Sequence, residues 1–127
     1  MSRKIMIILG LAILSRTAFA HHSFTAVFDP TQSVELRGTV TSVAWMNPHV
    51  WFYIDVVNEA GQVENWGFEM GSPNALFRRG WSHETLEEGA QVTVSGVKAR
   101  DGSTRAAVRT VVLESGESLF GAQNENN

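Results

Sequence analysis

The chain has 127 residues, 43% of them hydrophobic, which is enough for one folded domain. It contains no cysteine, which excludes disulfides and thiolate chemistry, so a metal ion would need histidine, methionine or carboxylate ligands. Thirteen acidic residues against ten basic ones give a formal net charge of -3. Because this balance lacks the basic surface expected of a nucleic-acid-binding protein, we expect no nucleic-acid partner.

The first twenty residues have the pattern of a secretory signal peptide. Two basic residues are followed by an apolar run over residues 5–14 and by a polar stretch that ends in Ala-Phe-Ala at Ala20. The run is shorter than the roughly 20 residues of a membrane span. We therefore expect cleavage after Ala20, no span afterwards and a periplasmic or secreted product, with an uncleaved anchor as the alternative.

Cleavage after Ala20 would change both the charge and the first residue of the chain. It would remove three of the ten basic residues and none of the thirteen acidic ones, which leaves a net charge of -6. It would also make His21 the amino terminus, with His22 directly after it.

The first predicted strand begins at Val34, where hydrophobic residues start to recur at every second position. The apolar phase shifts between Val40 and Val43. One extra residue inserted in a strand has this effect, so we predict a β-bulge near residues 41–42 and a strongly bent strand.

Two further strands are predicted after a turn at residues 46–49, where Asn47 precedes a proline. The second strand covers residues 50–57 and places Trp51 and Tyr53 on the face opposite to its aliphatic residues. The third covers residues 63–70. It presents three large side chains on one face: Trp66, Phe68 and Met70.

The pattern then becomes helical before two last strands. Serine and proline in succession predict the start of a helix of about two turns over residues 74–79. A second short helical turn is expected within residues 81–89. Strands are predicted over residues 91–100 and 106–115, and the polar tail at residues 121–127 is expected to be disordered.

Five short strands with a helix between the third and the fourth are the element order of a small Greek-key barrel of the OB type. We therefore predict an all-β fold with a five-stranded OB-like barrel over residues 34–120, preceded by an N-terminal segment at residues 21–33. A two-sheet β-sandwich is the alternative.

Several motifs carry a resemblance to a known family: HHSF, NPHVWFYIDV, NWGFEMGSPNALFRRGW and LEEGAQVTVSG. At these motifs the sequence resembles a family of small exported bacterial proteins that is known only as a domain of unknown function. The resemblance runs from His21 to about Phe120 and implies export, an OB-like barrel and no established activity. Where the family usually has Pro-Gly-Asp before the fourth strand, this chain has Glu-Gly-Ala at residues 88–90, a loop change that should not alter the architecture.

A free N-terminal histidine can chelate a metal ion through its α-amine and its imidazole Nδ1. One imidazole from elsewhere would complete a T-shaped set of three nitrogens that resembles the histidine brace of copper proteins, and such a set favours Cu(II). His49 is a better candidate for this imidazole than His83, because the loop between the first two strands lies on the binding side of OB-type barrels. The sequence thus predicts a copper site built from His21 and His49.

Further ligands are available near this site. His22 allows a second mode, in which the amine, the His22 amide and its imidazole form fused rings on Cu(II). Met46 and Met70 could supply sulfur to Cu(I). Each residue also has a structural interpretation: the terminal histidines can be a disordered start, His49 can fix its turn by bonding a backbone carbonyl, and the methionines can pack in the core.

A metal-free binding site is the alternative function. Trp51 and Tyr53 could form a stacking platform for a sugar or an apolar ligand, and Arg78 with Arg79 could hold a carboxylate or phosphate. The partner would then be a small molecule or an envelope protein. The chain has no recognisable catalytic motif, so we expect a binding protein and no enzymatic activity.

Overall fold

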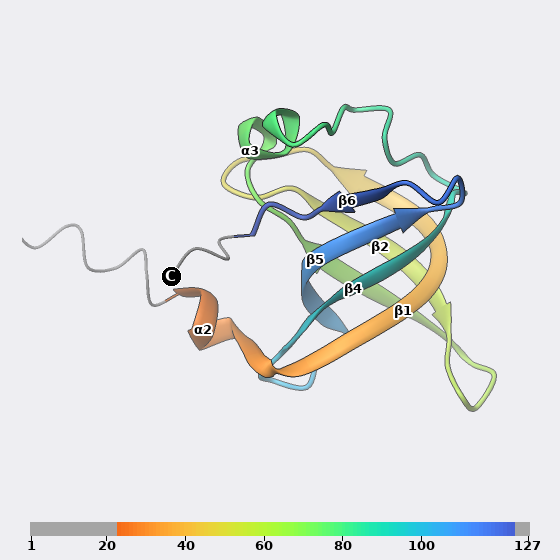
Figure 1. The fold of residues 1–127 in the computed structure, drawn as a ribbon. Coiled ribbons are helices and arrows are strands. Elements are labelled where there is room, and N and C mark those ends of the chain that lie inside the picture. The colour runs from red at the N-terminus through yellow and green to blue at the C-terminus, as the bar shows by residue number, and fades with distance from the viewer. Residues whose placement is uncertain (1–22, 124–127) are drawn as a thin grey trace, which may run out of the picture.

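Antiparallel strand pairs, closed by one parallel pair, form a barrel in residues 23–123, the part of the chain that the computed structural model describes (Figure 1). The barrel strands are β1 (Phe28–Ala44), β2 (Trp51–Val57), β3 (Val63–Glu69), β4 (Gln91–Ala99) and β5 (Arg105–Leu113). They are ordered β3-β2-β1-β4-β5, and the pairing of β3 with β5 closes the ring. This topology confirms the OB-like barrel, because the sheet closes on itself where a sandwich would have two separate sheets.

Strand β1 bends around the barrel and pairs with two neighbours. Its first part pairs with β4 and its second part with β2, and the register with β2 shifts between Val40 and Ser42. The predicted bulge is therefore confirmed. The strand begins at Phe28, earlier than the predicted Val34, because Phe28 pairs with Ala99 and is buried.

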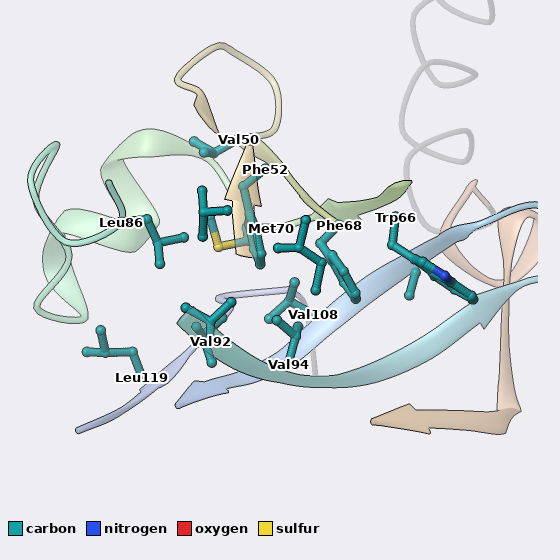
Figure 2. Packing of buried hydrophobic residues seen from close by; sticks show 14 of the residues in the cluster. Val50, Phe52, Trp66, Phe68, Met70, Leu86, Val92, Val94, Val108 and Leu119 are labelled. Carbon is teal, nitrogen blue, oxygen red and sulfur yellow. The ribbon is translucent and has the colours of Figure 1, made fainter. Parts of the chain in front are cut away.

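The core fills the barrel with the side chains that the alternation pattern placed inward (Figure 2). Phe68 is stacked between Phe52, at 5.3 Å between ring centroids, and Trp66, at 6.3 Å. Met70 lies with its sulfur inside the same cluster. The prediction that Trp66, Phe68 and Met70 share one inward face is confirmed.

Helix α3 (Pro73–Arg78) lies across one end of the barrel (Figure 1). Ser72 caps it, since its hydroxyl accepts a hydrogen bond from the Ala75 backbone N–H at 3.2 Å. The second helical turn expected at residues 81–89 is not a helix. Ser82 and Thr85 form a hydrogen-bonded turn there instead, and the loop is anchored to the core by its apolar side chains.

The chain after β5 differs from the sequence prediction. A short strand, β6 (Ser118–Phe120), pairs with β5, and its Leu119 is buried in the core. Residues 121–123, which the prediction placed in the disordered tail, are packed against the barrel, and Gln123 is buried. Residues 124–127, like the expected leader and His21 and His22, lie outside the described residues. No helix within residues 23–123 has the length and hydropathy needed to cross a membrane.

Candidate functional site

The imidazole of His49 is held in a defined orientation at the start of β2. Its Nδ1 lies 2.9 Å from the carbonyl oxygen of Met70, which can only accept a hydrogen bond. Nδ1 must therefore carry the hydrogen, and in the neutral ring Nε2 keeps its lone pair. The side chain is 38% exposed, so the ring is only partly covered.

Glu69 is the acidic neighbour of this imidazole. Its Oε1 lies 3.5 Å from His49 Nδ1, and its side chain is only 16% exposed. Burial raises the pKa of the Glu69 carboxyl, and His49, the nearby Gln123 amide and the charge of Arg105 oppose this rise without cancelling it. The site therefore holds a carboxyl that is poorly solvated when ionised.

A pH-dependent effect on stability follows from this burial in the metal-free protein. Because the folded-state pKa of Glu69 is raised above its ordinary value of 4.5, stability from this group is present below that value and is lost as the pH rises through the folded-state pKa. Glu69→Gln removes this loss. In urea unfolding, the variant should have a larger free energy of unfolding than the wild type at pH 7.5 and no such advantage at pH 3.5.

Glu64 on the same strand provides a control of opposite sign. Hydrogen bonds from Asn58 and from the Trp66 indole lower the pKa of its carboxyl, so its contribution to stability is present above its ordinary pKa and is lost as the pH falls. Glu64→Gln should therefore lose stability at pH 7.5. If both variants moved in the same direction, the buried environment assigned to Glu69 would be incorrect.

The first described element lies against the outer face of the barrel near this site. Helix α2 (Ser23–Val27) carries Phe24, whose ring lies 5.3 Å from that of Phe28 at a tilt of 41°. Phe24 and Trp51 both pack against a second, outer apolar cluster. Trp51 is paired in register with Glu69. The chain therefore enters the described structure on the face that carries Trp51 and Glu69.

The other predicted ligands have different surroundings. Met46 is exposed at the β1–β2 turn, three residues before His49. Met70 contributes its carbonyl oxygen to the site, while its sulfur is buried in the core. His83 lies against the rings of Trp45, at 4.6 Å, and Phe77, at 5.4 Å, and within residues 23–123 no hydrogen bond joins it to His49.

The residues proposed for a metal-free site are not all brought together. Trp51 and Tyr53 stack at 6.5 Å between centroids on the outer face of β2. Arg78 and Arg79 are exposed at the end of α3, and within residues 23–123 no hydrogen bond or ion pair joins their side chains to either aromatic ring. Trp51 is also half-buried by the outer apolar cluster.

The described residues do not form a metal centre by themselves. Between Ser23 and Gln123, no group of three histidine or carboxylate side chains is arranged to hold a metal ion. His49 is one oriented imidazole, and the predicted site needs the nitrogens of His21, which lies outside the described residues. Sequence reasoning missed Glu69 and Gln123 as neighbours of His49, although an acid between Phe68 and Met70 was a visible signal for Glu69.

The chain is similar to a protein family and to a solved structure. A family model described as a family of unknown function, DUF6152, matches residues 9–108. The comparison with curated proteins found no match. A solved structure of the mitochondrial single-stranded DNA binding protein from S. cerevisiae is similar over 65% of this chain and 94% of that chain, with 14% sequence identity and a TM-score of 0.48.

This neighbour corrects one expectation. The prediction that no nucleic acid is a partner is contradicted, because a protein similar to this barrel is a single-stranded DNA binding protein. The physical reason is that net charge averages over the whole surface, whereas binding depends on the local charge of one face. The similarity itself assigns no ligand to this chain.

Proposed function

The chain belongs to the family of unknown function DUF6152, and from its own site we propose that it is an exported, periplasmic or secreted protein that binds copper. The ligands are the α-amine and imidazole of His21, made available by cleavage after Ala20, and Nε2 of His49. His22 and Met46 assist as nearby donors. The protein holds the ion and carries out no catalysis.

The hydrogen bond from His49 Nδ1 to the Met70 carbonyl oxygen is the observation that carries this proposal. Histidines that bind metals through one ring nitrogen almost always donate the other N–H to a carbonyl or carboxylate, which fixes the tautomer and the ring orientation. His49 has such a partner at 2.9 Å and the Glu69 carboxylate nearby at 3.5 Å. The same bond also fixes the turn, so a measurement must decide whether Nε2 binds an ion.

The position of helix α2 supports the contribution of His21. Phe24 packs in the outer cluster that includes Trp51, and Trp51 is two residues from His49. An extended chain spans at most about 3.5 Å per residue, so three residues bring His21 within about 10 Å of Phe24. This reach is compatible with a site shared between His21 and His49.

Titration of the correctly cleaved protein with Cu(II) tests the proposal. The test is made in a His22→Ala background, which prevents fused chelate rings through His22. There, His49→Ala should weaken Cu(II) binding by at least about 10- to 100-fold, because the loss of a hydrogen-bond partner of a ligand alone already has an effect of this size. The electron paramagnetic resonance spectrum should also change, because one imidazole nitrogen leaves the ion.

His83→Ala in the same background is the matched control. This variant also loses one histidine, but His83 packs against Trp45 and Phe77. Its affinity and spectrum should equal those of the parent. Equal affinity and an unchanged spectrum for His49→Ala would falsify the shared site.

A metal-free binding module is the second candidate. The stacked rings of Trp51 and Tyr53 on the outer face of β2 favour it, because aromatic side chains on this face are what OB-type barrels use to bind ligands. Its partner would be a small molecule or an envelope protein. A cleaved protein that binds no Cu(II) through His49 would leave this candidate as the better one.

A further inference from the structure

The last described residues lie directly against the end of β3. The backbone N–H of Gly71 donates to the carbonyl oxygen of Gly121 at 2.8 Å, and the N–H of Gly121 donates to the carbonyl oxygen of Arg109 at 2.9 Å. Residues 121–123 are thereby tied both to β5 and to the residue that follows Met70.

Two glycines allow this close approach. A Cβ at Gly71 would press on the carbonyl group and the side chain of Ala122, and a Cβ at Gly121 would lie 2.6 Å from the side chain of Val108. Real Cβ atoms do not approach other atoms so closely, so a side chain at position 71 would push the segment away from the end of β3, and one at position 121 would push it away from β5.

The backbone conformation of Ala122 is also unusual. Its φ is 53°, in the left-handed region that residues other than glycine rarely adopt. Such conformations are strained and persist only where the surroundings enforce them, often at functional sites. Here the strained residue directly precedes Gln123.

Gln123 points back into the site and completes it. It is only 8% exposed, and its Nε2 donates to the Met70 carbonyl oxygen at 3.0 Å. The same oxygen accepts the hydrogen bond from His49 Nδ1 at 2.9 Å, so both of its lone pairs are used.

We propose that Gln123 is a positioning residue for His49. By fixing the Met70 carbonyl, its amide holds the acceptor that keeps the imidazole in the Nδ1–H form with Nε2 free. The strained turn at Ala122 and the glycine contacts at residues 71 and 121 serve to place this amide. The effect of Gln123 on the His49 tautomer concerns the metal-free protein and stands by itself. Its effect on the affinity for copper rests on the proposed function.

Nitrogen NMR of the histidine rings in the metal-free protein at pH 8 tests the positioning directly. The wild type should show His49 with the hydrogen on Nδ1. Gln123→Met keeps the size of the side chain but removes the amide, and it should shift His49 toward a mixture of tautomers. The affinity for Cu(II) should fall about tenfold, which is the lower end of the effect seen when a metal ligand loses its hydrogen-bond partner.

Gln91→Met is the matched control. Gln91 is a half-buried glutamine whose Nε2 also donates an internal hydrogen bond, to Thr39, but it lies on β4. This variant should leave the His49 tautomer and the copper affinity unchanged. If Gln123→Met does not fold, Gln123→Ala also removes the amide donor without adding a charge, and it should shift the tautomer in the same way.

The two claims fail separately. A His49 tautomer that is the same in the wild type and in the folded Gln123 variant would overturn the positioning role, as would a wild type with the hydrogen on Nε2. If the wild type binds no copper while the tautomer shifts, the proposed function is wrong and the positioning role stands.

Discussion

Replacing Phe68 with alanine should lower the free energy of unfolding by about 3–5 kcal/mol, the usual cost of truncating a buried aromatic ring. Phe68 is 0% exposed and lies between the rings of Phe52 and Trp66. Its neighbours come from β2 and β3, whose pairing fixes their positions, so they cannot collapse far into the cavity that alanine would leave. Urea unfolding followed by tryptophan fluorescence measures the loss.

Phe120→Ala provides the comparison at the surface. Phe120 is the same residue type on β6, but it is 56% exposed. The variant should lose less than about 1 kcal/mol, since little apolar area returns to water. Equal losses for the two variants would mean that the core is not centred on the strands that enclose Phe68.

The barrel could be predicted from the sequence because its determinants are local. Alternation along residues 50–57 and 63–70 identified the inward faces, and the phase shift after Val40 identified the bulge. The cap at Ser72 needs only residues within one turn of α3. In each case the information lies within a few positions of the element that it specifies.

The missed features depend on contacts that are distant in sequence. The start of β1 at Phe28 is defined by its pairing with Ala99, and the polar residues that follow Phe28 hide the alternation. Strand β6 has only three residues, too few for a periodic signal, and it is fixed by β5 and by the Trp81 indole bonded to Phe120. Periodicity cannot detect such elements.

The candidate site was predictable in part for the same reason. His49 stood out because a histidine beside a turn and a strand is a local feature. Glu69, 20 positions away, joins it only through the pairing of β2 with β3, and Gln123 joins it through residues 121–123. For Trp51, the sequence left open how much of the ring is exposed, and in the structure the outer cluster with Phe24 covers part of it.

Adding three alanines in front of His21 should weaken Cu(II) binding about 100-fold or more. The addition converts the α-amine of His21 into an amide. His21 then offers the ion only its imidazole, where before it offered both the amine and the imidazole. Two donors joined in one chelate gain about 10²–10⁴ in affinity over separate donors, and this gain is lost. Isothermal titration with Cu(II) in the presence of a competing chelator measures the change.

The number of added residues matters to this experiment. One or two alanines would leave a histidine at the second or third position, where the new amine and the intervening amides could form fresh chelate rings on Cu(II). Three alanines move His21 to the fourth position and remove that possibility. The same three alanines added after Asn127 are the matched control, with unchanged affinity expected. An extended protein that binds Cu(II) as tightly as this control would place the ion away from the His21 amine, and copper binding would then have to be explained by His49 and other side chains.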